Sequence, residues 1–494
     1  MPLTPDRTGQ GPPPRRDPAG ASVPPGGAPS AGPDRTTVAV AVGGGFLALL
    51  DTTVVNVSLH ETTVRFGDLA QVQWVVTAYL LALTALMPAS GRLAVRFGAK
   101  RVFATALAVF AAGSAACALS STLPQLIAAR AVSGAAAGVL TPVATILLTT
   151  GVAREHLGRV QSLNGTVMLL SPLLGPTVGG LLVGAWGWPA VYAVNVPLCA
   201  LLLALTAWRV PGGPPAARGA VPFDLLGLVS AAACTVGAVL AVHTLAGPGR
   251  PEPAALLTPA AVAVLSGAVF VVRQLRAAHP LLDLRLFGHR VYRVAALNIL
   301  CLGFVLYSPM MLVPLYFEAA RGEGTVASGL LMSTGGIGVL AAGWLCPRLM
   351  RGIGGGGALL TGMLLTILAT VPLTRLSAHT PYPLLCATLA VRGLGTGLTI
   401  VPAMTRAFQS VRPPSIPDAA AQLNLVQRIG GAVALAAVTV VLEAAARRSH
   451  GLAPAAFAHS FTWLLAAYAV MLLPAAALLL ADRHEARRTS RPAA

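Results

Sequence analysis

Long apolar runs separated by short polar segments fill most of this 494-residue sequence. About 20 consecutive apolar residues are enough for a helix to cross a bilayer, and the pattern predicts fourteen such helices. They are expected near residues 38–59, 72–90, 102–120, 124–148, 162–184, 190–209, 224–246, 255–273, 294–317, 326–346, 357–374, 382–404, 419–442 and 461–481. The seventh and eighth are the least distinct, because their short polar separator could also be a break inside a re-entrant pair.

Two short motifs occur twice and divide the spans into halves. A Gly-x-Leu-x-x-Arg motif at 91–96 recurs at 343–348, and Arg130 with its following glycines recurs at Arg392. The first six and last six spans are therefore predicted to be duplicated bundles with two helices inserted between them. The predicted segments are a disordered tail at 1–36, bundles at 37–210 and 293–481, the insert at 211–292 and a second tail at 482–494.

The basic residues predict an orientation. With the N-terminus placed in the cytoplasm, 25 of the 34 Lys and Arg residues fall in inward-facing loops and tails, as the positive-inside rule requires. Arginine supplies all the positive charge except Lys100, and Ala, Gly and Pro are abundant. This composition indicates a GC-rich bacterial genome, so we expect a plasma-membrane protein with both termini in the cytoplasm.

Composition and missing motifs exclude several function classes. Only 10% of the residues are charged, against about 25% in soluble domains. The net charge of +18 is spread over many loops, so no nucleic-acid partner is expected. The sequence has no Walker-type phosphate loop, dinucleotide fingerprint or metal-ligand spacing, so we expect no cofactor and no metal. A membrane enzyme or a sensor would need a long catalytic loop or a soluble output domain, and the sequence offers neither.

Asp51 is the candidate for chemistry, because it lies in the second half of the first apolar run. A carboxylate inside a membrane span costs roughly 2.5–3.5 kcal/mol on insertion scales and needs a partner or a wet cavity. One interpretation is a proton-binding group in a transport pathway. The alternative is a structural acid that caps or pairs with a neighbouring helix.

Arg130 is the expected partner of Asp51, since it is equally costly inside the fourth run. A permanent guanidinium nearby would favour the ionised acid and let its proton leave as the geometry changes. These two residues are thus the predicted proton-coupling pair. Arg130 could instead extend along its helix to the membrane surface.

Several motifs, in chain order, resemble the major facilitator superfamily and in particular its fourteen-span drug:proton antiporters. Each is weak alone, but together they run over nearly the whole chain after the tail. They are LDTTVVNV at 50–57, Gln73-Trp74 with Tyr79, GRLAVRFGAKR at 91–101, Arg130 with Gly134 and Gly138, GPTVGG at 175–180, Trp188 with Asn195-Val196-Pro197, and PLLDLRLF at 280–287.

Three positions depart from the family pattern. His60 stands where proline is usual, and Gln427-Arg428 stands where the family often has Arg-Gln. Val95 replaces the acid of the loop motif, which in the family is thought to latch that loop to a neighbouring helix. The resemblance therefore leaves open whether this latch is weakened or moved.

The resemblance implies an all-α membrane protein of the major facilitator fold that exchanges protons for an amphipathic organic compound such as an antibiotic. It implies gating or antiport roles for Gly91, Arg96, Gly98, Gly175, Pro176, Gly179 and Gly180. The glycine- and proline-rich stretch could equally be ordinary tight helix packing. A symporter or uniporter that imports a nutrient is the alternative function.

Substrate contacts are predicted from aromatic and amide side chains in apolar runs. The candidates are Trp74, Tyr79, Asn298 and Tyr307, although most such residues serve packing. The expected partners are a small-molecule substrate, protons and the lipid bilayer, and we expect the protein to act as a monomer.

Overall fold

The computed structural model describes residues 34–489, apart from 68, 151, 153–155, 213–223, 247–252, 279 and 450–451. Within the helices, the side chains at 60, 69–70, 166–169, 172–173, 176, 242–243, 245–246, 325–326 and 483–489 also lie outside the description. Most of the predicted tail at 1–36 and the last five residues of the tail at 482–494 therefore cannot be compared with the structure.

The described chain is built of helices joined by short connections. The helices before the insert are α1 (Arg35–Phe66), α2 (Leu69–Val72), α3 (Trp74–Leu86), η1 (Met87–Ala89), α4 (Ser90–Phe97), α5 (Ala99–Ala118), α6 (Leu123–Thr149), α7 (Leu157–Trp186), α8 (Ala190–Ala193) and α9 (Asn195–Arg209). The insert contains α10 (Leu225–Ala246) and α11 (Pro253–Arg276). The remaining helices are η2 (Leu284–Gly288), α12 (Arg290–Leu315), η3 (Tyr316–Ala320), α13 (Thr325–Thr370), η4 (Pro372–Arg375), α14 (Tyr382–Gln409), η5 (Pro413–Ser415), α15 (Ile416–Arg448) and α16 (Pro454–Thr489).

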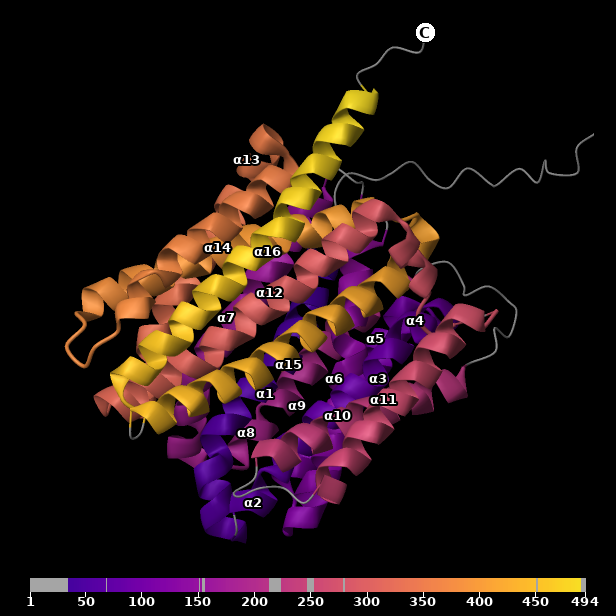
Figure 1. The fold of residues 1–494 in the computed structure, drawn as a ribbon. Coiled ribbons are helices and arrows are strands. Elements are labelled where there is room, and N and C mark those ends of the chain that lie inside the picture. The colour runs from indigo at the N-terminus through magenta and orange to yellow at the C-terminus, as the bar shows by residue number, and fades with distance from the viewer. Residues whose placement is uncertain are drawn as a thin grey trace, which may run out of the picture.

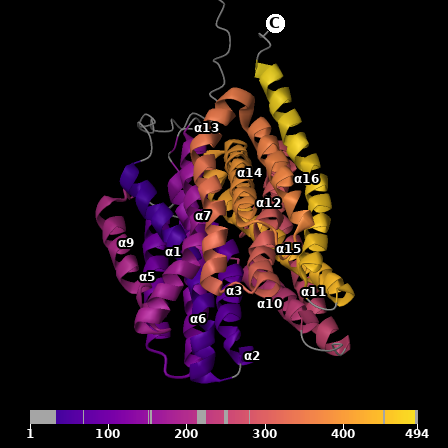
Figure 2. The ribbon, with the colours of Figure 1, turned by 90° about the vertical axis from the view of Figure 1, so that its left-hand side faces the viewer.

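Eleven helices in the described residues are long and apolar enough to cross a membrane, and two further apolar helices are shorter. The multi-pass, all-α prediction is therefore confirmed, whereas the count of fourteen spans stays a prediction. One difference concerns α13, which covers both predicted spans at 326–346 and 357–374. The chain turns back within it at Gly354, whose φ of 76° and ψ of 172° suit a residue without a Cβ atom. Figure 2 shows this turn at the end of the bundle.

The helices form two groups that lie side by side. Figures 1 and 2 show α1 to α9 on one side and α12 to α16 on the other, with α10 and α11 along one flank. Helix α10 contacts α3 and α11, and the apolar window of α11 is not buried by protein. An apolar helix without protein cover is what a lipid-facing position allows.

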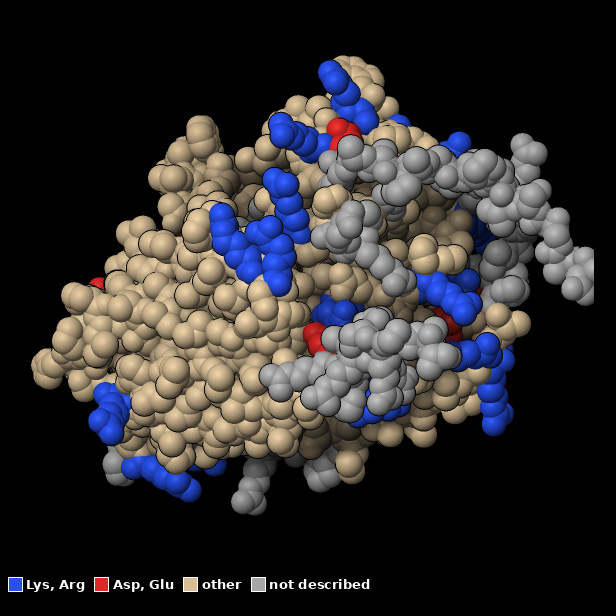
Figure 3. Space-filling view, turned by 90° about the horizontal axis from the view of Figure 1, so that it is seen from above, with Lys and Arg blue, Asp and Glu red and all other residues tan. Residues whose placement is uncertain are grey.

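The two groups meet through α7 against α13 and α14, and through α4 and α6 against α15. Ser162 on α7 donates a hydrogen bond to the carbonyl oxygen of Gly343 on α13, at 2.6 Å. These contacts lie toward the end of the bundle at which α16 finishes (Figure 1). Seen from above, that end carries several groups of Lys and Arg with few acids among them (Figure 3), in keeping with the loops predicted to face the cytoplasm.

Candidate functional site

Asp51 and Arg130 form a buried ion pair inside the first group of helices. The Nη1 atom of Arg130 lies 2.6 Å from Oδ2 of Asp51, and each residue is only 1% exposed. Asn195 of α9 donates a hydrogen bond from Nδ2 to the other carboxylate oxygen, at 2.8 Å. Both oxygens of the acid are thus satisfied, as a buried carboxylate requires. Arg130 does not extend to the membrane surface.

The glycines after Arg130 bring α6 close enough to α3 for this pairing. A Cβ atom on Gly134 would lie 2.2 Å from the carbonyl oxygen of Tyr79, and one on Gly138 would lie 2.1 Å from that of Leu83. Because the backbones touch, the guanidinium of Arg130 stacks on the Tyr79 ring, 3.9 Å from its centroid. Its Nε also donates to the carbonyl oxygen of Val75. Close small-residue packing therefore fixes where the charge lies.

A central pocket lies on another face of α1. Leu49, Thr52 and Thr53 line it, spaced three and four residues apart as one helix face requires. Asp51 is not among the lining residues. The acid therefore points into the first group of helices, while its neighbours on the same turn face the pocket.

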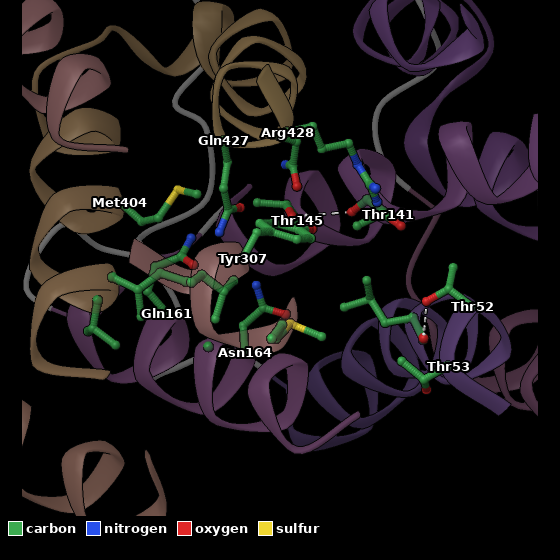
Figure 4. Close-up of a pocket in the computed structure, with 17 residues that line it drawn as sticks. Thr52, Thr53, Thr141, Thr145, Gln161, Asn164, Tyr307, Met404, Gln427 and Arg428 are labelled. Carbon is green, nitrogen blue, oxygen red and sulfur yellow. Dashed lines mark hydrogen bonds between the residues drawn. The ribbon is translucent and has the colours of Figure 1, made fainter. Parts of the chain in front are cut away.

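The pocket lies between the two groups of helices, and its empty space, open solvent included, is about 1000 Å³. In Figure 4, α1, α6 and α7 contribute Thr52, Thr53, Thr141, Thr145, Gln161 and Asn164, and the other side contributes Tyr307, Met404, Gln427 and Arg428. Leu306, Met310, Ile400 and Val401 add apolar walls. Apolar walls with a few convergent polar groups are typical of sites for small organic molecules.

Tyr307 is the one predicted substrate contact that the structure places in this pocket. It is held there by α15, because a Cβ atom on Gly431 would lie 2.5 Å from the tyrosine ring. A Cβ atom on Gly303 of α12 would lie even closer to its neighbour, the carbonyl oxygen of Gln427. The contact between α12 and α15 thus positions Tyr307, Gln427 and Arg428 together.

The other three predicted substrate contacts do not line the pocket. Tyr79 is fully buried against Arg130, and its hydroxyl donates to the carbonyl oxygen of Ala48 on α1. Asn298 donates to the carbonyl oxygens of Val294 and Pro474, and so joins α12 to α16. Trp74 is half-buried at the start of α3. The geometry of Tyr79 and Asn298 is that of helix packing, and a role in substrate binding stays a prediction for all three residues.

The predicted gating loop forms α4 and its flanking turns. A Cβ atom on Gly91 would lie 2.8 Å from the carbonyl oxygen of Pro417 at the start of α15, so this glycine permits contact between the two groups of helices. Gly98 has a φ of 85°, and Arg96 is exposed with its guanidinium over Phe97. Val95, in place of the family's acid, is 39% exposed and makes no latch.

The glycine- and proline-rich segment of α7 lies against α1 beside Asp51. A Cβ atom on Gly175 would lie 2.0 Å from Oγ1 of Thr53, and one on Gly179 would lie 3.0 Å from the carbonyl oxygen of Val54. Gly180 has open space instead. The side chain of Pro176 lies outside the described residues. The segment therefore joins α7 to the turn of α1 that carries both the acid and two pocket threonines.

Sequence reasoning gave no role to several residues that form the site. Asn195 was recognised only as part of a family motif, although it binds Asp51. Gln161 and Asn164 lie one turn apart at the start of the fifth run, and this spacing of two amides was a usable signal. Both residues are buried, and among the described residues neither Gln161 Nε2 nor Asn164 Oδ1 has a hydrogen-bond partner.

Two groups of apolar helices around a central pocket are the architecture of secondary transporters. The chain belongs to the Major Facilitator Superfamily, whose family profile matches residues 41–435.

Similar proteins agree with this membership. The chain is 31% identical to the multidrug resistance protein B homolog of Mycobacterium tuberculosis over 85% of its own length and 80% of that protein. It is 32% identical to the methylenomycin A resistance protein of Streptomyces coelicolor, over 90% and 93% of the two chains. The crystal structure of the human organic anion transporter MFSD10 is similar in fold, with a TM-score of 0.63 at 16% identity, over 91% of this chain and all of that one (100%).

Proposed function

We propose that this protein is a proton-coupled exporter of amphipathic organic compounds, among them antibiotics, that works by alternating access. Its place is the bacterial plasma membrane, with both termini in the cytoplasm. Helices at 37–210 and 293–481 act as the two moving bundles, and the insert at 211–292 lies beside them. It is a transporter that performs no covalent chemistry on its substrate.

The names of the relatives support export of antibiotics. Two proteins about one third identical over most of this chain are called a multidrug resistance protein homolog and a methylenomycin A resistance protein. A lincomycin resistance protein of Listeria innocua is 26% identical over 81% of this chain. The pocket has the mixture of apolar walls and amide and hydroxyl groups that such compounds require.

The observation that carries proton coupling is the buried pair of Asp51 and Arg130 on the helix face behind the pocket. A proton arriving on Asp51 removes its charge and breaks the ionic part of the contact with Arg130. Because α1 carries Thr52 and Thr53 on its pocket face and lies against Gly175 of α7, a small rotation of α1 changes the pocket. Proton binding and substrate binding thus bias the same helix, as coupling requires.

The contacts between the bundles support an alternating mechanism. Gly91 against Pro417 and Ser162 against Gly343 hold the bundles together at the end predicted to face the cytoplasm. This arrangement corresponds to a state closed on the cytoplasmic side. Rocking of one bundle against the other must break these contacts to admit substrate from inside the cell.

The test is export by Asp51→Asn, which keeps the size of the side chain and one of its two acceptor oxygens but cannot exchange a proton. Reconstituted vesicles with an imposed pH gradient are loaded with methylenomycin A, and flux is measured. We expect gradient-driven flux to fall to the level of substrate-loaded vesicles that contain no protein. The matched control is Glu443→Gln, whose side chain is 57% exposed near an outer helix end, and it should retain flux. Undiminished gradient-driven flux in Asp51→Asn would refute proton coupling through this acid.

A further inference from the structure

Among the described residues, Arg428 is the only charged one that lines the central pocket. It lies on α15 next to Gln427, which lines the pocket too. In Figure 4 the two side chains leave this helix in different directions, Gln427 toward Tyr307 and Gln161 and Arg428 toward Thr141 of α6. The charge of the pocket is therefore that of one guanidinium.

The acids of the chain are poorly placed to neutralise Arg428. The sequence has no Asp or Glu between Glu323 and Asp418, and Asp418 lies ten residues before Arg428 on the same helix, roughly 15 Å away at 1.5 Å per residue. Asp51 is already bound by Arg130 and Asn195. No described carboxylate forms an ion pair with Arg428. Within the described part of the chain, the pocket thus carries a positive charge without a protein counter-ion.

Two amides at the pocket have an unpartnered atom among the described residues, the donor Nε2 of Gln161 and the acceptor Oδ1 of Asn164. The hydroxyls of Thr52, Thr141 and Thr145 donate to carbonyl oxygens of their own helices, so their protons are not available to a ligand. In contrast, Nε2 of Gln161 has no acceptor among the described residues, although Gln161 is only 3% exposed. A buried donor without an acceptor is rare in proteins and indicates a missing partner.

We propose that the transported compound is an amphipathic anion, typically a carboxylate, whose charged group binds Arg428. This proposal rests on the export function above and specifies its substrate class. A planar guanidinium matches a carboxylate with two parallel N–H donors. The apolar remainder of the compound lies against Leu306, Ile400 and Met404. A cationic compound would meet Arg428 with no acid to offset the repulsion.

The first experiment measures which charge the purified, full-length protein prefers. Arylacetates with naphthyl, indolyl and biphenyl rings are compared with the corresponding amides and arylethylamines, by ligand-induced thermal stabilisation in detergent. We expect stabilisation by the carboxylates, less by the amides and none by the amines. If no carboxylate stabilises the protein, or if the amines do so equally well, the proposal is wrong.

Variants test whether Arg428 causes the preference for carboxylates. Arg428→Gln should weaken carboxylate binding by roughly tenfold or more, as expected for loss of a charge-assisted contact, and leave amide binding unchanged. Arg428→Lys keeps the positive charge but loses the two parallel N–H donors, so its affinity for carboxylates should lie between those of the wild type and Arg428→Gln. This intermediate result separates a charge effect from misfolding. The control is Arg447→Gln, which removes an 83% exposed cation on the same helix. An unaltered carboxylate preference in Arg428→Gln would overturn the assignment.

Flux in vesicles separates this proposal from the export function. If one proton exchanges for one substrate, export of an anion moves two charges, of a neutral amide one charge and of an amine none. An inside-negative potential should therefore accelerate carboxylate exit most and amine exit not at all. Absence of any pH-driven flux would contradict the export function itself. Flux that is present but insensitive to potential, or fastest for amines, would contradict only the anionic substrate.

Discussion

Arg130 and Arg392 occupy corresponding places in the two bundles, yet their partners differ. Arg130 of α6 meets a carboxylate at 2.6 Å and has a tyrosine ring 3.9 Å away. Arg392 of α14 donates from Nη2 to the carbonyl oxygen of Val305 at 2.8 Å and to the hydroxyl of Tyr468 at 3.1 Å. Its Nε is buried without a partner among the described residues. The first bundle therefore neutralises its arginine with a titratable acid, whereas the second does not.

Under the proposed function, this difference gives different tasks to the two bundles. A neutral ion pair changes charge when a proton binds, so only the first bundle can respond to the proton gradient at this position. The second bundle keeps the positive charges of Arg392 and Arg428 without a deep acid of its own. A permanent positive charge suits the binding and orientation of a substrate. In the proposal above, Arg428 binds the anionic group of that substrate.

Replacing each arginine by Met should give the largest difference in stability between the two bundles. Arg130→Met leaves Asp51 buried and unpaired, which costs roughly 3–5 kcal/mol. Arg392→Met leaves only a carbonyl and a hydroxyl without their donor, which costs about 1–3 kcal/mol. Equilibrium unfolding in mixed detergent micelles measures both, with Arg447→Met as the exposed control. Equal losses for the two variants would show that the acid partner makes no difference.

The sequence predicted the costly charges of the site better than its pocket. Asp51 and Arg130 stood out because any charge inside an apolar run needs an explanation, and the structure places them in contact. The choice of Trp74 and Asn298 as substrate contacts rested on residue type alone, and neither lines the pocket. Their proposed roles remain untested.

The helix faces could not be predicted for a physical reason. Lipid is as apolar as the protein interior, so a membrane helix is apolar on all sides and its periodicity does not reveal which face turns inward. The position of Asp51 behind the pocket, opposite Thr52, depends on contacts from α6 and α9 that the sequence of α1 does not contain. The connection between the predicted spans at 326–346 and 357–374 was expected, but the sequence did not show that it is a single tight turn at Gly354.

The two bundles should lose similar stability when a closely packed glycine is replaced. A Cβ atom on Gly134 would lie 2.2 Å from the carbonyl oxygen of Tyr79, and one on Gly393 would lie 1.9 Å from that of Gly335. Backbone cannot rotate away as a side chain can, so Gly134→Ala and Gly393→Ala should each cost about 1–3 kcal/mol. Gly180→Ala, with open space around it, is the control. The fraction of protein that remains monodisperse after heating measures the losses, and a large difference between the two variants would argue against a shared packing plan.

Replacing the tyrosines beside the two arginines should destabilise the second bundle more than the first, the reverse of the order expected for the arginine variants. Tyr79→Phe removes a hydroxyl that donates to the carbonyl oxygen of Ala48 but keeps the ring under Arg130, so about 0.5–1.5 kcal/mol should be lost. Tyr468→Phe removes an acceptor from a buried guanidinium that already has one unpartnered nitrogen within the described residues, and a hydrogen bond to a charged group is worth about 1.5–3 kcal/mol. The second bundle should therefore lose more here, although it loses less when its arginine is replaced. Unfolding measurements on the two Phe variants test this directly, and a greater loss for Tyr79→Phe would mean that Arg392 does not depend on the Tyr468 hydroxyl.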